Sequence, residues 1–199
     1  MNSQGISPTV SEALAERVCA LSLENISDSV RNRCQDLLLD VAGLCVAARN
    51  SDYVAALKRS LDAGGPCTAL GHAGSYSPED AAMLNGTAAH GEDFDDTFEG
   101  GPVHSGAVVV PAVLAACERF GRDGASALLG IAAGVETMCR LSLVAPKLIH
   151  KAGFHPTAVL GVMASSLAVS VVLNLDKKQV VNALGIAGTQ ACGLMAAQF

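Results

Sequence analysis

The sequence has no tryptophan, few aromatic residues (4%) and few charged residues (16%). Its 13 Lys and Arg residues, against 19 Asp and Glu, leave a net charge of −6 with no basic cluster. Proteins that bind nucleic acid need a basic surface, so we expect no nucleic-acid partner. A hydrophobic content of 50% over 199 residues suffices for one core, which excludes a disordered chain.

The sequence also lacks the usual signs of secretion. Its N-terminus has no basic region followed by an apolar run, as a secretory signal would. The seven cysteines are odd in number, widely spaced and mostly set in apolar runs, which favours reduced core thiols over a disulfide framework or a zinc site. We therefore expect a cytoplasmic protein.

Helical patterns follow one another along the chain. Thr9 and Glu12 have the spacing of a capping box, and Ser77-Pro78 has the form of a helix start. One short strand is expected at 67–70. The main helical segments are expected at about 9–23, 28–48, 105–120, 125–144 and 156–175, with a last helix capped by Asp176 and Gln179. This pattern predicts one all-α domain over residues 1–199.

The apolar segment 155–175 has about the roughly 20 residues that a membrane span needs. Serines and Asn174 recur through it, and no aromatic or Lys/Arg belt flanks it. We therefore expect a buried helix of a large helical domain and no membrane partner.

The stretch HGEDFDDTFEGGPVHSG, residues 90–106, places five carboxylates between two histidines, and no Lys or Arg occurs from residue 60 to 118. Like charges this close repel, so a metal, a partner or solvent must relieve them. Asp93 to Thr97 fit the D-x-D-x-T pattern of haloacid-dehalogenase-type phosphotransferases, but no β-branched run precedes them to form the required strand. A Mg²⁺ site and a solvated acidic loop stay open as alternatives.

Two histidines stand where helices are expected to begin. His104 precedes one apolar helix, and His155, followed by Pro156, precedes another. At a helix N-terminus the dipole favours the neutral ring, and free N–H groups can receive a carboxylate. The two histidines and the acidic turn together indicate a site for proton transfer.

Four successive stretches, GTAAHGEDFDDTFEGGPVHSGAVVVPAVLAACE, GVETMCRL, GFHPTAVLG and ALGIAGTQACGLMAAQF, resemble landmarks of the MmgE/PrpD family. That family includes 2-methylcitrate dehydratase, cis-aconitate decarboxylase and iminodisuccinate epimerase. The resemblance implies a large helical domain joined to a smaller α/β lid domain, a homodimer, members about twice this length, and no metal or organic cofactor. The 199 residues would then be the helical domain, truncated before the lid.

The resemblance also implies the site residues. The family's Asp-x-x-x-Thr falls on Asp93 and Thr97, and its two histidines fall on His104 and His155. Asp93 would orient a histidine or hold a proton, and Thr97 would bond a substrate carboxylate, while Asp95 and Asp96 cap or brace the turn. A further family lysine would follow the GLM landmark, outside these 199 residues.

The implied substrates are small di- or tricarboxylates, which need positive charge nearby. The candidate sources are Arg140, named here as a substrate-binding residue, Lys147, Lys151, a protonated histidine or the part of the family's chain that is absent. Two classes of function follow: a cofactor-independent lyase or isomerase, and a non-catalytic helical fragment or interaction module of the same family.

Overall fold

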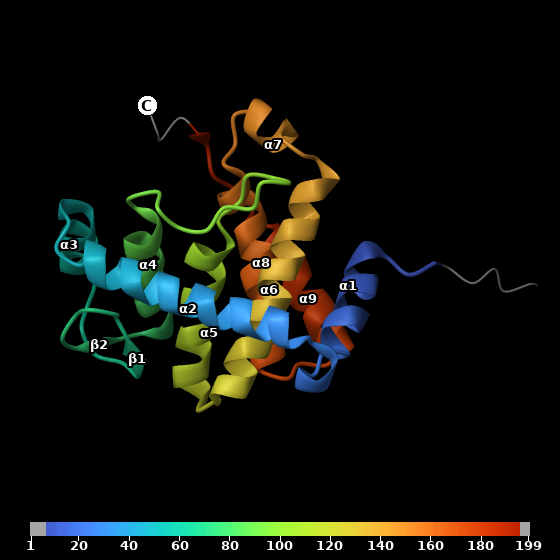
Figure 1. Cartoon of the computed structure of the whole chain (residues 1–199), viewed down its shortest axis with the longest axis horizontal. Helices are drawn as coiled ribbons and strands as arrows, with labels where there is room; N and C mark the ends of the chain where they lie inside the picture. Colours follow the sequence, from blue (N-terminus) through green and yellow to red (C-terminus); the bar gives the residue numbers. More distant parts are fainter. Residues whose placement is uncertain (1–6, 196–199) are drawn as a thin grey trace, which may run out of the picture.

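The computed structural model describes residues 7–195, and within them helix follows helix, which confirms the all-α prediction (Figure 1). One two-stranded antiparallel hairpin, β1 (Cys67–Thr68) with β2 (Ser75–Tyr76), interrupts the series. The α-helices are α1 (Val10–Cys19), α2 (Asp28–Ala48), α3 (Asp52–Arg59), α4 (Pro78–His90), α5 (Ser105–Phe120), α6 (Gly124–Val144), α7 (Leu148–Lys151), α8 (Pro156–Val172) and α9 (Lys177–Gly188), with one 3-10 turn, η1 (Leu23–Asn25).

The predicted capping residues start their helices. Thr9 and Glu12 form the capping box of α1, and Asp176 and Gln179 form that of α9. Ser77 accepts a hydrogen bond from the Asp80 N–H, ahead of Pro78, at the start of α4. The short helices α3 and α7 and the strand β2 were not predicted, because each is too short to show a clear hydrophobic period.

The core lies between three apolar helices, α5, α6 and α8, which pack against one another. In Figure 1, α2 runs across α4, α5 and α6, and its buried face contacts all three. The helices α1 and α9 pack together against α8 and close a smaller apolar cluster. The ends of α4, α5 and α8 are therefore held by one continuous core.

Pro111 lies inside α5. Proline has no N–H to donate to the carbonyl four residues earlier, which here belongs to Ala107. The neighbouring α4 approaches that carbonyl at Gly86, where an added Cβ would lie 3.0 Å from the oxygen. The proline and the glycine thus allow α4 and α5 to pack closely next to the site described below.

The apolar helices α6 and α8 each have one side buried in the molecule. Within residues 7–195, α6 alone has the length and hydropathy to cross a membrane, and half of its most apolar window is buried. The segment 155–175 forms α8, which at 17 residues is shorter, and its Ser170 is buried with its hydroxyl donating to the Ser166 carbonyl. Both helices have the packing expected of core helices.

Candidate active site

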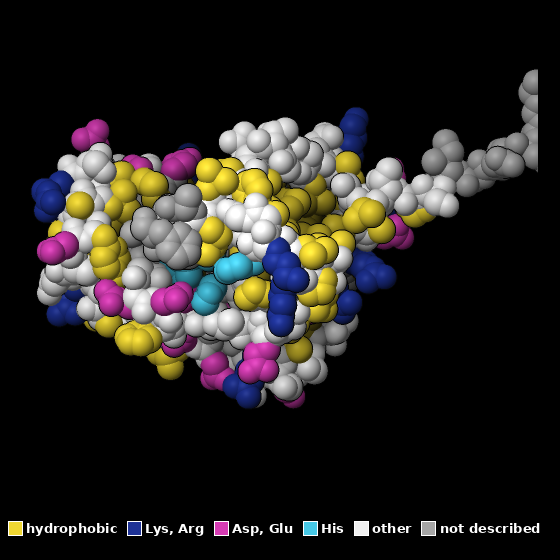
Figure 2. Space-filling model, turned by 90° about the horizontal axis from the view of Figure 1, so that it is seen from above, with side chains coloured by type: hydrophobic (Ala, Val, Ile, Leu, Met, Phe, Trp, Pro, Cys, Tyr) yellow, Lys and Arg dark blue, Asp and Glu magenta, His cyan; other side chains and the backbone are white. Residues whose placement is uncertain are grey.

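Three histidines meet at one end of the helical domain. His90 is the last residue of α4, while His104 and His155 are the N-cap residues of α5 and α8, as predicted for the latter two. Their ring centroids lie 4.8 Å apart for His90 and His104, 5.6 Å for His90 and His155, and 6.4 Å for His104 and His155. We call these three residues the histidine cluster, and Figure 2 shows histidine side chains together on this face.

The buried carboxylate of Asp95 lies against two members of the histidine cluster, His90 and His104. Its side chain is fully buried, with Oδ2 2.9 Å from His90 Nδ1 and Oδ1 3.3 Å from His104 Nδ1. Burial opposes ionisation of this carboxyl, but the imidazoles of His104 and His90 outweigh burial and lower its pKa to about 2. Asp95 is therefore an anion that faces two imidazole rings.

Asp96 has a different task, because it caps α5. The Gly106 N–H donates to its Oδ1 over 2.7 Å, and the Ser105 N–H donates to its Oδ2 over 3.2 Å. An added Cβ on Gly106 would lie 2.5 Å from that Oδ1, so any larger residue there would displace the capping carboxylate. Burial raises the pKa of Asp96, with Asp95 as a further cause, against these two hydrogen bonds. The expectation that these two residues cap or brace the turn is confirmed: Asp96 caps α5, and Asp95 braces the turn by contacting His90 and His104 at its two ends.

Asp93 and Thr97 lie beside His104, as the family resemblance implied. Asp93 Oδ1 is 3.9 Å from His104 Nε2, and the Asp93 side chain is 80% exposed. Its φ of 57° is in the left-handed region, which Asp tolerates better than most residues. Thr97 Oγ1 is 3.4 Å from His104 Nδ1. The structure thus brings Asp93, Thr97, His104 and His155 to one place.

The crowded carboxylates of residues 92–99 point to different partners. Asp95 faces histidines, Asp96 caps a helix, and Glu92 accepts a hydrogen bond from the Tyr53 hydroxyl over 3.0 Å. The chain before Asp93 is helix α4, so the strand required by the phosphotransferase pattern is absent. Because Asp95 is buried, a purely solvated acidic loop is also excluded.

The two predicted histidines have opposite pKa shifts. The Asp95 carboxylate next to Nδ1 raises the pKa of His104, and the charges of Asp93 and Asp96 add to it, against burial. Burial lowers the pKa of His155, and the neighbouring His90 and His104 lower it further. The expectation of a neutral ring is therefore confirmed in direction for His155 and is wrong for His104, whose carboxylate neighbours outweigh the helix dipole.

Arg140 is not brought to the histidine cluster. It lies in α6, forms an ion pair with Glu136 and lines a separate cavity of about 540 Å³ between α1 and α6, together with Arg17. Lys147 and Lys151 belong to the turn that leads into His155, because α7 starts directly after Lys147 and ends at Lys151. Figure 2 shows Lys or Arg side chains next to the histidines on this face.

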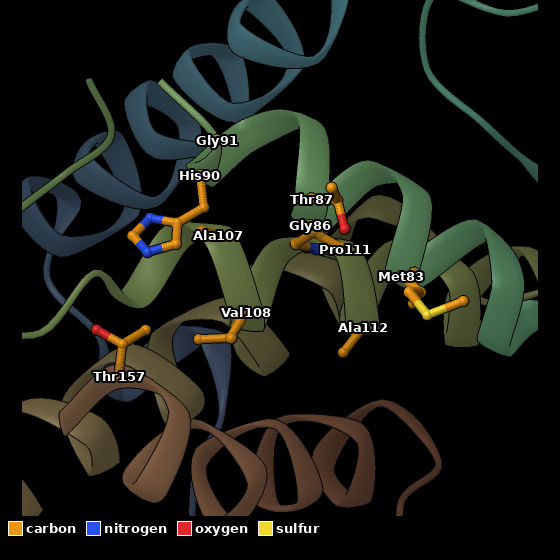
Figure 3. A pocket seen from close by; sticks show the side chains of 11 residues that line it. Met83, Gly86, Thr87, His90, Gly91, Ala107, Val108, Pro111, Ala112 and Thr157 are labelled. Carbon is orange, nitrogen blue, oxygen red and sulfur yellow. The ribbon is translucent and has the colours of Figure 1, made fainter. Parts of the chain in front are cut away.

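An apolar cavity of about 470 Å³ opens from the histidine cluster between α4, α5 and α8. His90 and Thr157 lie at one end of it, and Met83 and Ala112 lie at the other (Figure 3). The Thr157 hydroxyl accepts a hydrogen bond from the His104 N–H over 3.1 Å. A small molecule at the cluster would therefore have space on the side of His90.

The last described residues return to the histidine cluster. The His155 N–H donates to the Gly193 carbonyl over 3.0 Å, and the Met195 N–H donates to the Gly153 carbonyl over 2.8 Å. Phe154 and Leu194 form an isolated antiparallel bridge between the same two segments. The GLM landmark is thus attached to the segment that carries His155.

Four side chains could surround a cation by distance alone: His90, Asp93, Asp95 and His104 have ligand atoms within 4.8 Å of one another. However, both Asp95 oxygens already face imidazole nitrogens, at 2.9 and 3.3 Å. We therefore assign no metal to these residues.

Comparison with known proteins agrees with the landmarks. Residues 12–199 match the MmgE/PrpD N-terminal domain. Similar proteins are a cis-aconitate decarboxylase of Aspergillus terreus (32% identity, covering 100% of this chain and 43% of the relative), the cis-aconitate decarboxylase-like protein oryM of Aspergillus oryzae (31%, 96% and 42%) and the cis-aconitate decarboxylase of Homo sapiens (30%, 94% and 41%). The chain thus spans less than half the length of these relatives.

Proposed function

Because this chain belongs to the MmgE/PrpD family, whose N-terminal domain it matches over residues 12–199, we propose that it forms part of a cofactor-independent lyase or isomerase. The substrate is a small di- or tricarboxylate, and the chemistry is acid/base proton transfer. Several similar proteins are named cis-aconitate decarboxylases, which puts decarboxylation ahead of dehydration and epimerisation. The observation that supports this most is the pair His104 and His155, close together with opposite pKa shifts.

The opposite shifts give the two imidazoles different roles. His104, with its raised pKa, keeps a proton that can be donated or can compensate a substrate carboxylate. His155, with its lowered pKa, has a free nitrogen that can accept a proton next to a carboxylate in a dehydration or an epimerisation. In a decarboxylation the C–CO₂ bond breaks, its electron pair stays on carbon, and a protonated imidazole such as His104 supplies the proton that the carbon takes up. Thr97, in contact with His104, offers a hydroxyl to the substrate, and Asp93 orients His104 from the solvent side.

Further positive charge for a polycarboxylate comes from two sources in this proposal. Lys147 and Lys151 flank the turn before His155. The family lysine implied by the resemblance would follow the GLM landmark, which is hydrogen-bonded to the His155 segment. Arg140 receives no role here, since it is paired with Glu136 at another cavity. We also propose that the protein forms a homodimer and is located in the cytoplasm.

Turnover of cis-aconitate, 2-methylcitrate and iminodisuccinate by a longer form that includes this chain tests the proposal. We expect one of them to react, and we expect the rate to survive exhaustive chelation with EDTA. Loss of turnover with EDTA that Mg²⁺ or Zn²⁺ restores would contradict the cofactor-independent chemistry. No reaction with any of the three would contradict the substrate class.

A second candidate is a non-catalytic helical interaction module. It is favoured by exposed apolar side chains around the cluster, among them Phe94 (80% exposed), Val144 (79%) and Leu194 (63%). Such a surface is suited to contact with another protein or domain. Sizing experiments on the 199-residue chain test it: self-association that Phe94→Ser and Val144→Ser abolish would support a docking role, and a sharp monomer would oppose it.

A further inference from the structure

We propose that Asp95 is a positioning residue that holds His90 and His104 in the same tautomer, and that His90 is thereby a third working histidine of the site. Neither residue is given this role by the family resemblance, which names Asp93, Thr97, His104 and His155. For its catalytic meaning this inference rests on the proposed function. Its geometry can be tested without any substrate.

Asp95 cannot contact a substrate directly, because none of its side chain is exposed. It lies between two rings from different helices, with Oδ2 2.9 Å from His90 Nδ1 of α4 and Oδ1 3.3 Å from His104 Nδ1 before α5. An ionised carboxylate only accepts hydrogen bonds, so each nitrogen that bonds to it must carry the proton. His90, which makes such a hydrogen bond, is then the Nδ1–H tautomer when neutral, and its Nε2 is free. His104, whose Nδ1 faces Oδ1 at 3.3 Å, takes the same tautomer when it donates to that oxygen.

His90 is placed to use that free nitrogen. Its ring is nearer to His104 (4.8 Å) and to His155 (5.6 Å) than those two rings are to each other (6.4 Å). It also lines the cavity that opens from the cluster, where Figure 3 shows it opposite Thr157. A molecule in this cavity therefore meets the His90 ring, and Asp95 fixes which nitrogen it meets.

The two carboxylate oxygens of Asp95 differ in their hydrogen bonding. Oδ2 has its hydrogen bond to His90, whereas the buried Oδ1 has no hydrogen-bond partner within residues 7–195 and only the ion-pair approach of His104. An unsatisfied buried carboxylate oxygen is costly, and a small shift of His104 would satisfy it. Catalytic hydrogen bonds are often long without substrate and shorten in the complex. His104 Nδ1 can therefore move toward Asp95 Oδ1 and donate a hydrogen bond to it.

The test is the tautomer of each histidine, read by long-range 1H–15N correlation in the chain labelled with 15N-histidine. Single His→Gln substitutions assign the five histidines. We expect His90 and, above its pKa, His104 to be Nδ1–H tautomers. If His90 is the Nε2–H tautomer in the folded wild-type chain, the positioning role is overturned without any variant.

Asp95→Asn sharpens the test, because the amide offers one acceptor and one donor in place of two acceptors. At least one of His90 and His104 should therefore switch to the Nε2–H tautomer, while Asp36→Asn, at an exposed carboxylate paired with Arg33 outside the histidine cluster, should leave both unchanged. Unchanged tautomers in folded Asp95→Asn would overturn the role. In a longer form with turnover, Asp95→Asn should lower kcat by up to about 10⁴-fold, as for the orienting carboxylate of a catalytic triad. The expected tautomers with no turnover of any carboxylate would refute only the proposed function.

Discussion

The helices α5 and α8 both begin at a histidine, but the pKa values of these two histidines shift in opposite directions. Each starts at a histidine N-cap that makes no side-chain capping hydrogen bond, and each continues into an apolar, buried helix. Around His104, however, stand the carboxylates of Asp93, Asp95 and Asp96, which raise its pKa. His155 is partly buried and lies near His90 and His104, and both the burial and these imidazoles lower its pKa.

The difference shows that the helix terminus alone does not determine the charge of a histidine. Both rings are N-cap residues, so the different neighbours, above all those brought by the loop between α4 and α5, account for the opposite shifts. A pair of imidazoles with different proton affinity, 6.4 Å apart, can supply a proton from one ring and accept a proton at the other.

The largest effect is expected from removing either titrating ring in a longer, active form. His104→Gln and His155→Gln should each lower kcat by about 10²–10⁴, the usual contribution of a positioned acid or base. His72→Gln serves as the matched control, since His72 lies by Lys58 and outside the histidine cluster, and it should retain near-normal turnover. Near-normal rates in both cluster variants would mean that neither helix start carries the chemistry.

The cap of α5 should be the most sensitive point for stability. Gly106→Ala would put a Cβ 2.5 Å from Asp96 Oδ1, so we expect unfolding in urea to become easier by about 1–3 kcal/mol. Gly185→Ala, at an open position in α9 with nothing within 4 Å of the added Cβ, should instead stabilise by about 0.5–1 kcal/mol. Equal effects of the two substitutions would show that Asp96 does not need the glycine.

For the stability of the protein, the hydrogen-bond acceptors of Asp96 should matter more than its negative charge. Asp96→Ala removes both hydrogen bonds to the start of α5 and should cost about 1 kcal/mol, the usual loss for a helix cap. Asp96→Asn keeps an acceptor and removes a buried charge, so it should cost less. A larger loss for Asn than for Ala, measured by urea unfolding, would mean that the α5 terminus needs the anion.

The smallest expected effect is a pH dependence of stability with opposite sign for the two histidines. The raised pKa of His104 gives stability that is full below about 6.5, the unfolded value, and is lost as pH rises through the folded pKa. The lowered pKa of His155 gives stability that is present above about 6.5 and is lost as pH falls through the folded pKa. The cost of His104→Gln should therefore be greater at pH 6 than at pH 9, and that of His155→Gln should show the reverse.

The local features of this fold were predictable from the sequence. Capping residues such as Thr9 and Asp176 act within four residues of their partners, and the long apolar periods of α2, α5, α6 and α8 need no tertiary information. The family resemblance added Asp93, Thr97, His104 and His155, which the structure brings together.

The parts that depend on the path of the loop were missed. His90 has a visible signal, a histidine five residues before Asp95, but only the folded loop turns Asp95 inward between His90 and His104. The pKa of His104 was misjudged for the same reason. Arg140 stays a prediction without support from its surroundings, because it pairs with Glu136 four residues earlier on the same helix, a spacing that indicates such an ion pair.

The most direct measurement is the titration of His104 and His155 in one sample, followed by the 13Cε1 or 15N shifts of labelled histidine and assigned with the two Gln variants. The neighbours of these rings predict that His104 titrates above pH 6.5 and His155 below it, with His104 protonated first as pH falls. Titration of both rings at the same pH, or of His155 at the higher pH, would contradict the assignment of His104 as proton donor and His155 as proton acceptor.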